Sequence, residues 1–320
     1  MLYNRLGQSG LQISRLSFGS WVTFHSQLNN SSAEELMNLA FDHGVNFFDN
    51  AEVYAGGKSE ELMGAVLKKL AWPRLKYLVS TKFYWGLSDG PNQRNTLNRK
   101  YLLESMAQSL KRLQLEHVDL IYAHRPDPQT PIEETVRAMN DIIEKGQALY
   151  WGTSEWSAAE ISKAYEVAKE NSWHRPIVEQ PQYNLFERKK VESEFAPLYK
   201  YMGLGLTTWS PLASGLLTTK YLDSIPAGSR LDLKSMSWLK EVAADPKKVN
   251  QIRKFKEVSE RLAVKPSQLA IAWCLKHDHV SSVILGATSK QQLLENLGAL
   301  DLVEKISSQQ LDELNLIFPA

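Results

Sequence analysis

Four side chains that can move or orient a proton follow three consecutive apolar runs of the chain. Asp49 and Tyr54 come after the first run, and Lys82 and His124 end the next two. A carboxylate, a phenol, an amine and an imidazole are the groups that general acid–base catalysis uses. Each one alone has an ordinary structural explanation, such as a cap or a packed ring. Their recurrence after three successive runs favours one shared catalytic pocket.

The segments that carry these residues are predicted strands in a chain that alternates strands with helices. The predicted strands cover residues 16–18, 45–48, 77–82, 118–124, 148–152, 177–180, 205–209 and 280–285. Before them, the turn-rich stretch 7–10 between two short alternating segments predicts a β-hairpin. Strands joined by helices in this way favour a parallel sheet with right-handed crossovers.

Three helix starts carry capping sequences. Segments 32–35 and 157–160 have the form of a capping box, with Ser first and Glu fourth. Thr130 and Pro131 together predict an N-cap followed by the first helical residue. Between residue 211 and about residue 250 no strand is predicted, and a connection of this length is typical of a lid.

Two folds are consistent with this alternation of strands and helices, a closed (β/α)8 TIM barrel and an open doubly wound sheet. The open sheet of a dinucleotide-binding protein should carry G-x-G-x-x-G after its first strand, whereas residues 19–24 read Gly-Ser-Trp-Val-Thr-Phe. We therefore predict a TIM barrel that forms a single domain over residues 1–320. In that fold catalytic groups lie at the C-terminal ends of the strands. Because alternate strand residues share a face, Asp49, Lys82 and His124 are expected to converge at this rim.

The composition excludes several classes of function. Lys and Arg number 37 against 36 Asp and Glu, for a net charge of +1, so no basic surface for nucleic acid is expected. A single cysteine, Cys274, excludes an intrachain disulfide and a cysteine-based zinc site, and we predict no metal. No signal-peptide-like run follows Met1 and no segment is apolar enough for direct membrane insertion, so a cytoplasmic location is expected.

The four candidate residues resemble the Asp, Tyr, Lys and His tetrad of the aldo-keto reductases. Within that superfamily the chain is similar to the branch of the voltage-gated potassium channel beta subunits and their bacterial and plant relatives. Segments 19–24, 50–55, 84–86, 125–128, 150–154 and 270–275 carry that similarity. The resemblance implies a small-molecule carbonyl substrate, NADP(H) as cofactor, and a homo-oligomer such as a tetramer.

The chemistry of carbonyl reduction explains these residue types. The carbonyl oxygen needs an acid, and tyrosine, with a pKa of about 10, is a reluctant donor. A cationic Lys82 about 4 Å from the phenol oxygen would favour the phenolate by roughly 4 kcal/mol at an effective dielectric near 20. We therefore expect Lys82 to lower the pKa of Tyr54 toward neutrality. Asp49 would keep Lys82 charged, and His124 would orient the carbonyl oxygen.

The same resemblance assigns cofactor contacts along the chain. Ser154 and Gln180 should contact the carboxamide, Trp209 should stack under the nicotinamide, and Thr288 and Gln292 should reach the 2′-phosphate. The full set is Ser20, Trp21, Gln27, Asp49, Ser154, Gln180, Trp209, Ser210, Pro211, Leu212, Ala213, Ser214, Lys220, Arg230, Gly286, Thr288, Gln292, Glu295 and Asn296. Glu155 is left out, because an acid facing the cofactor phosphates would repel them.

Three classes of function stay open. The favoured one is an NADPH-dependent reductase of aldehydes or ketones. The second is a regulatory subunit that partners a channel alpha subunit and senses redox state through bound NADP(H). Vertebrate channel subunits carry Asn where this chain has His124, which favours the reductase. The third is a Schiff-base enzyme that uses Lys82, and Tyr54 five residues after Asp49 argues against it.

Overall fold

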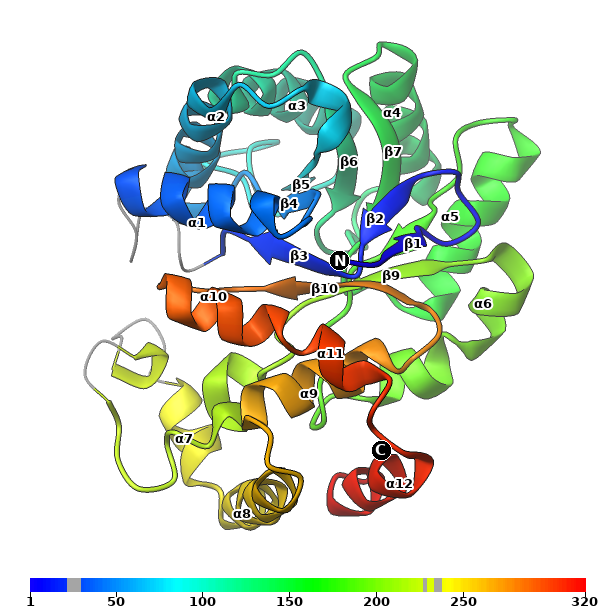
Figure 1. Ribbon diagram of the computed structural model, residues 1–320. Coiled ribbons are helices and arrows are strands. Elements are labelled where there is room, and N and C mark those ends of the chain that lie inside the picture. The colour runs from blue at the N-terminus through cyan, green and yellow to red at the C-terminus, as the bar shows by residue number, and fades with distance from the viewer. Residues whose placement is uncertain (22–29, 227–228, 233–237) are drawn as a thin grey trace.

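Eight parallel strands close into a barrel in the order β10-β3-β4-β5-β6-β7-β8-β9 (Figure 1). This computed structural model describes residues 1–21, 30–226, 229–232 and 238–320. The barrel strands are β3 (Leu16–Gly19), β4 (Phe47–Asp49), β5 (Leu78–Phe83), β6 (Val118–Ala123), β7 (Ala148–Thr153), β8 (Val178–Glu179), β9 (Gly205–Thr208) and β10 (Val280–Leu285). The predicted TIM barrel is confirmed.

Helices follow the strands and form the outer layer of the barrel (Figure 1). They are α1 (Asn30–Asp42), α2 (Lys58–Leu70), α3 (Arg99–Leu113), α4 (Ile132–Glu144), α5 (Ala158–Glu170), α6 (Ala196–Met202), α7 (Trp238–Ala244), α8 (Pro246–Arg261), α9 (Pro266–Leu275), α10 (Lys290–Leu297), α11 (Leu300–Val303) and α12 (Ser308–Ile317). Strand residues that point outward, among them Phe48, Val79 and Ile121, are fully buried against these helices. Burial of such a side chain stabilises the fold by about 1.5–3 kcal/mol.

The N-terminal hairpin closes one end of the barrel. Strands β1 (Tyr3–Arg5) and β2 (Gln12–Ser14) pair antiparallel, as the turn at 7–10 predicted. Leu6 and Ile13 of the hairpin pack into the interior with Phe47, Leu78 and Leu120 of the barrel strands. These lumen residues precede Asp49 and Lys82 on their strands. The hairpin therefore covers the end of the barrel that is formed by the N-terminal ends of the strands. The catalytic candidates therefore lie at the opposite end.

Two of the three predicted helix starts are wrong. Ser32 lies inside α1, which already includes Asn30, so it cannot cap that helix. At α4 the N-cap is Pro131, without a side-chain cap, because the Thr130 hydroxyl donates to Asp127 instead (2.6 Å). The third start is confirmed, since Ser157 forms a capping box at the start of α5.

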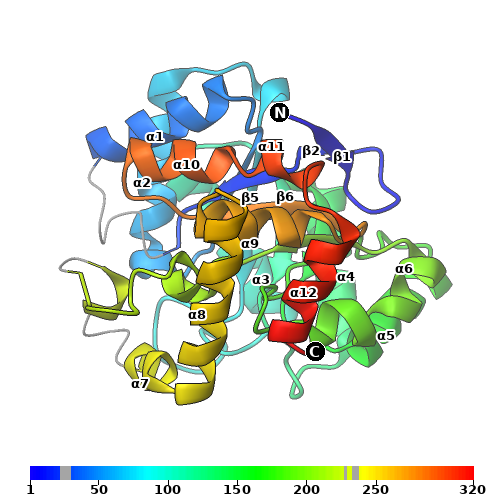
Figure 2. The same ribbon diagram turned by 60° about the horizontal axis from the view of Figure 1, so that its bottom comes forward.

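The long connection after β9 is more ordered than its lack of a predicted strand suggested. A 3-10 segment covers Ala213–Thr218, α7 lies within the connection, and α8 begins before its expected end near residue 250. Helix α8 lies beside α12 (Figure 2), where the Gln251 amide donates to the carbonyl of Ile317 (2.7 Å). The connection is thus tied to the C-terminal helix, and its role as a lid stays a prediction.

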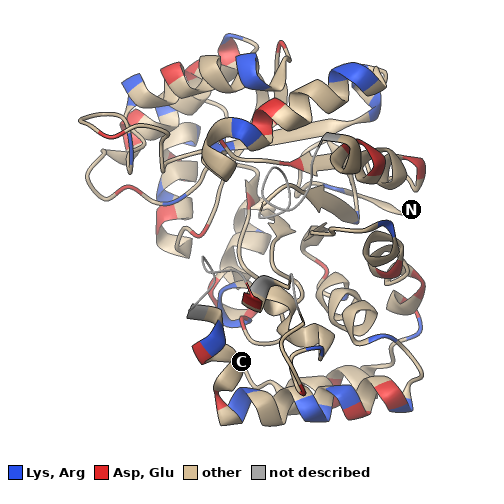
Figure 3. Cartoon of the chain, turned by 90° about the vertical axis from the view of Figure 1, so that its left-hand side faces the viewer, with Lys and Arg blue, Asp and Glu red and all other residues tan. Residues whose placement is uncertain are grey.

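Figure 3 shows acidic and basic residues interspersed along the outer helices. Within the part of the chain that the structure describes, no helix is both long and apolar enough to cross a membrane. The same residues contain no cluster of three or more His, Cys, Asp or Glu suited to a metal ion. Cys274 is buried, and burial raises the pKa of its thiol.

Candidate active site

Strand register brings the predicted tetrad to one rim. Asp49 pairs with Ser80, and Lys82 pairs with Tyr122 two residues further along β5. His124 directly follows β6, and its backbone N–H donates to the carbonyl of Phe83 (3.0 Å). Tyr54 begins a short 3-10 helix after β4 and turns back over the rim. The predicted convergence of the four residues is therefore present in the fold.

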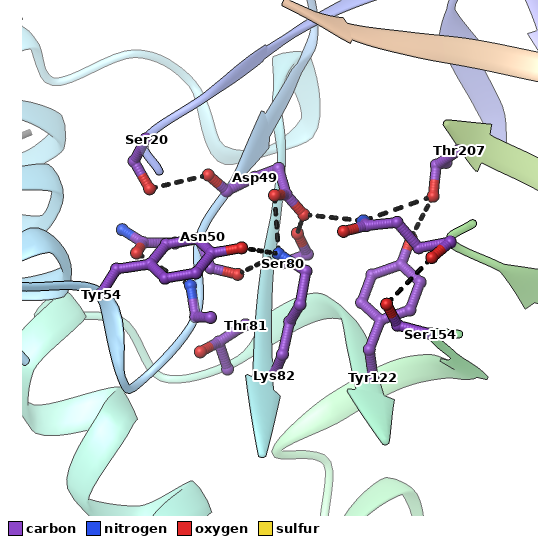
Figure 4. Close-up of polar contacts among 12 residues, drawn as sticks. Ser20, Asp49, Asn50, Tyr54, Ser80, Thr81, Lys82, Tyr122, Ser154 and Thr207 are labelled. Carbon is purple, nitrogen blue, oxygen red and sulfur yellow. Dashed lines mark hydrogen bonds and ion pairs between the residues drawn. The ribbon is translucent and has the colours of Figure 1, made fainter. Parts of the chain in front are cut away.

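Lys82 is the centre of the site (Figure 4). Its Nζ donates to Asp49 Oδ2 (2.6 Å), to the carbonyl of Asn50 (2.7 Å) and to the Tyr54 hydroxyl (3.3 Å). An ammonium has three N–H groups, and here each one meets an acceptor. Burial lowers the pKa of Lys82, and the carboxylate of Asp49 opposes this lowering. An amine held as an ammonium is not a nucleophile, which argues against the Schiff-base alternative.

The carboxylate of Asp49 is fixed by further lumen side chains. Its Oδ1 accepts from Ser80 Oγ (2.8 Å) and from Gln180 Nε2 (3.0 Å). Behind Gln180, the hydroxyls of Tyr122 and Thr207 lie 3.0 Å apart. Sequence reasoning did not assign Ser80, Tyr122 or Thr207 to the site. Strand alternation is the signal that finds the first two, because they share the lumen face with Lys82 and His124.

The expected lowering of the Tyr54 pKa is wrong for this structure. Burial of the phenol raises its pKa well above the ordinary value, and the negative charge of Asp49 adds to the rise. The positive charge of Arg125 opposes the rise. Tyr54 therefore stays protonated at neutral pH. A protonated phenol is the state that a proton donor requires, and the Lys82 hydrogen bond favours the phenolate once it forms.

His124 is a buried, neutral imidazole beside Tyr54. The two rings meet edge to face with centroids 6.0 Å apart, and Trp85 meets the imidazole in the same way at 6.4 Å. Burial lowers the His124 pKa well below the ordinary value, and the charges of Lys82 and Arg125 lower it further. Its Nδ1 is buried and has no hydrogen-bond partner among the described residues.

Glu155, which was not assigned to the predicted site, lies against one of its candidate residues, Trp209. Its Oε1 accepts from the indole N–H of Trp209 (3.0 Å) and from the backbone N–H of Gln182 (2.6 Å). Its Oε2 forms an ion pair with Lys190 Nζ (3.0 Å). The acid is thus neutralised by Lys190 and fixes the ring of Trp209. A positive φ of 61° at Glu155 turns its side chain toward Trp209, and no sequence pattern signals that angle.

The other polar cofactor candidates near the tetrad lie at the same rim. Ser20 Oγ donates to the carbonyl of Asp49 (3.0 Å), and Ser154 Oγ donates to that of Gln180 (2.9 Å). The rings of Trp21 and Trp209 meet edge to face, with centroids 5.9 Å apart. Gln27 lies outside the described residues.

The segment after β9 makes a compact turn of unusual backbone geometry. Ser210, Ala213 and Ser214 all have positive φ, at 56°, 47° and 57°. Such angles in residues other than glycine cost roughly 1–3 kcal/mol each and cluster at functional sites. Pro211 and Leu212 connect them, Lys220 lies beyond the turn with Nζ 5.0 Å from the Tyr221 ring centroid, and Arg230 starts a short 3-10 helix.

The cofactor candidates after β10 lie in the turn before α10 and along that helix. Gly286 and Thr288 are exposed, and the Gln292 side chain accepts from the Thr288 hydroxyl and N–H, both at 3.0 Å. Asn296 is buried on the same helix. The side chain of Glu295 accepts a hydrogen bond from Ser267 of α9. Lys290, the first residue of α10, forms an ion pair with Glu35.

These residues fit a nicotinamide dinucleotide in three respects. The indole of Trp209 is held at its N–H by Glu155 and is only partly buried, as a stacking ring requires. The unpartnered Nδ1 of His124 is a buried polar atom at the same rim. The exposed N-terminus of α10 offers the helix dipole to an anion.

Comparison with known proteins agrees with the geometry. The aldo/keto reductase family model matches residues 15–317. A protein of Oryza sativa subsp. japonica named "Probable voltage-gated potassium channel subunit beta" is 50% identical over 318 residues, which cover 99% of this chain and 96% of that protein. An Arabidopsis thaliana protein of the same name is 49% identical over the same shares. The chain belongs to the aldo/keto reductase family, as its tetrad predicted.

Proposed function

We propose that the protein reduces aldehydes and ketones to alcohols with NADPH as the hydride source. The observation that carries the proposal is the single hydrogen-bonded group in which Lys82 contacts both Asp49 and Tyr54, with His124 beside the phenol. Family membership supports an oxidoreductase, and the tetrad supplies the acid that reduction of a carbonyl needs.

Each residue of the tetrad has one task in this proposal. Trp209, Ser154 and the α10 N-terminus would hold NADPH, which would supply the hydride. The Tyr54 hydroxyl donates its proton to the carbonyl oxygen. Lys82 stabilises the resulting phenolate through its 3.3 Å contact, and Asp49 keeps Lys82 in position. The neutral imidazole of His124 orients the carbonyl oxygen without competing as an acid.

The names of the two plant relatives favour a second candidate function. Both are called probable voltage-gated potassium channel beta subunits. In this alternative the protein is an oligomeric partner of a channel alpha subunit and uses bound NADP(H) as a redox sensor. We also propose a tetramer, which light scattering after size-exclusion chromatography would test, and a cytoplasmic location, consistent with the unpaired, buried Cys274.

One experiment separates the two candidates. NADPH oxidation is followed with para-nitrobenzaldehyde for the native chain and for Tyr54→Phe, and NADPH binding is measured for both. Removal of the general acid should lower kcat at least about a hundredfold while NADPH binding is kept. If the native chain binds NADPH and reduces no carbonyl, the reductase proposal fails and the redox-sensing subunit becomes the better description.

A further inference from the structure

Arg125 adds a positive charge to the substrate side of the rim. It directly follows His124, and its Nη1 donates to the His124 carbonyl and lies 3.4 Å from Ser154 Oγ. Its Cζ lies 5.8 Å from the ring centroid of Trp85, which is 37% exposed. The guanidinium is therefore held between the ends of β5, β6 and β7, and it is only partly buried.

This guanidinium lacks an acidic partner within the described part of the chain. Three other arginines with little exposure have one, in the pairs Arg74–Asp119, Arg112–Glu60 and Arg188–Glu192. Arg15 also lacks an acid, but its guanidinium donates to the carbonyl of Leu275 and lies away from the candidate site. Removing a charge from water without a counter-charge is costly. Arg125 bears that cost next to the catalytic residues, where a substrate can provide the missing anion.

The N–H groups of Arg125 that are not used within the described part of the chain can bind an anion. Nη1 is engaged by protein oxygens, whereas Nε and Nη2 donate to no group among the described residues. A guanidinium binds a carboxylate through two parallel N–H groups, and stacking on an aromatic ring fixes the plane in which it does so. Trp85 provides that ring here.

Arg125 is also close enough to act on the reacting groups. Its charge contributes to the pKa values of Tyr54, Lys82 and His124, and in each case it acts against an added proton. An anionic substituent on the substrate would lie in the same field. A cationic substituent would be repelled by both Arg125 and Lys82.

We propose that Arg125 recognises an anionic group on the substrate, and that the protein prefers aldehydes and ketones that carry a carboxylate over neutral ones of the same shape. The inference rests on the proposed reductase function and names the substrate class of that same site. Arg125 acts as a specificity residue and takes no part in the transfer of hydride or proton.

The test compares two substrates of nearly equal shape, para-formylbenzoate and para-formylbenzamide, together with their meta and ortho isomers. The variants are Arg125→Gln, which removes the positive charge, and Arg125→Lys, which keeps the charge but loses the two parallel N–H groups of the guanidinium. The matched control is Arg137→Gln, because Arg137 also stacks on a tryptophan, with Cζ 5.9 Å from the Trp173 ring centroid, but lies on the outer helix α4.

We expect kcat/KM for at least one formylbenzoate to exceed that for its amide by about tenfold or more in the native chain, as a charge-assisted pair implies. Arg125→Gln should bring this ratio to about one, Arg125→Lys should leave it intermediate, and Arg137→Gln should keep the native ratio. Using the ratio cancels any effect of Arg125 on Tyr54, since both substrates need the same proton.

Two results would overturn the proposal. The first is an acid-to-amide ratio for every isomer that is the same in Arg125→Gln and in the native chain. The second is a loss of NADPH affinity in Arg125→Gln with no change in that ratio, which would assign Arg125 to the cofactor. If no aldehyde is reduced at all, the reductase proposal fails instead. Calorimetric binding of the same acid and amide to the NADP⁺ complex then still decides the role of Arg125.

Discussion

Two lysine–carboxylate pairs support the two aromatic side chains of the site, and they differ in exposure. Lys82 and Asp49 are 0% and 4% exposed and hold the hydroxyl of Tyr54. Lys190 and Glu155 are 34% and 21% exposed and hold the indole of Trp209. The first pair lies inside the barrel lumen, whereas the second joins the end of β7 to the segment after β8.

The difference in exposure predicts different energetics. Breaking a buried pair leaves an uncompensated charge and typically costs about 3–5 kcal/mol. A partly exposed pair is screened by water and is worth about 0–1 kcal/mol. The buried pair therefore sets the chemistry of Tyr54, and the exposed pair mainly sets the orientation of Trp209.

The largest effect should follow removal of the buried lysine. Lys82→Met leaves Asp49 without its cation and Tyr54 without the donor that stabilises the phenolate. We expect kcat to fall at least about a thousandfold and the free energy of unfolding to fall by about 3–5 kcal/mol. Steady-state kinetics and urea unfolding measure the two losses.

The matched control makes the same substitution in the exposed pair. Lys190→Met should lower the free energy of unfolding by no more than about 1 kcal/mol and should lower kcat only severalfold. Equal losses in Lys82→Met and Lys190→Met would show that burial does not separate the two pairs.

The pH profile of the proposed reductase activity tests the charge of Asp49. The donor Tyr54 must be protonated, and burial raises its pKa above 10.0, so activity should decline only above that pH. His124 must be neutral, and its pKa lies well below 6.5, so it stays neutral throughout the neutral range. We therefore expect kcat/KM for carbonyl reduction to be constant between about pH 7 and pH 9.

Asp49→Asn should shift the alkaline limit downward, because the negative charge that raises the Tyr54 pKa is gone. The plateau itself should fall about a hundredfold, since Lys82 loses its ionic partner. The measurement is kcat/KM against pH for both proteins. An unchanged alkaline limit would mean that Asp49 acts through the position of Lys82 and not through its charge.

The buried pair could be predicted from sequence because it obeys a local rule. Residues two apart on a strand share a face, and parallel strands end at the same rim, so Asp49, Lys82 and His124 follow from three short runs. The rule does not extend to electrostatics. The Tyr54 pKa was predicted in the wrong direction, because the penalty for burying a phenolate depends on atoms from many parts of the chain.

The exposed pair could not be predicted, because nothing local specifies it. It depends on the positive φ of Glu155 and on Lys190, which is 35 residues away. The failed cap at Thr130 has a similar origin, since Asp127 takes the hydroxyl that the pattern assigned to the helix. Sequence patterns thus predict strand faces well and the partners of polar loop side chains poorly.

The smallest effect should come from Glu155, where two substitutions separate charge from hydrogen bonding. Glu155→Gln keeps an oxygen for the indole N–H of Trp209 and for the N–H of Gln182 but loses the ion pair with Lys190. Glu155→Ala loses all three contacts. We expect Glu155→Ala to weaken NADPH binding about fivefold, as one lost hydrogen bond implies, and Glu155→Gln to weaken it less than about twofold.

Fluorescence titration with NADPH measures the affinity of each variant. Comparing the affinity of Glu155→Gln with that of Glu155→Ala separates the effect of the charge from that of the hydrogen bonds. If Glu155→Gln binds NADPH nearly as well as the native chain, the acid acts by holding the Trp209 ring, and its charge matters little. If it binds as poorly as Glu155→Ala, the ion pair with Lys190 is the feature that fixes Trp209. The exposed pair would then resemble the buried one in strength, and exposure would no longer explain the contrast between them.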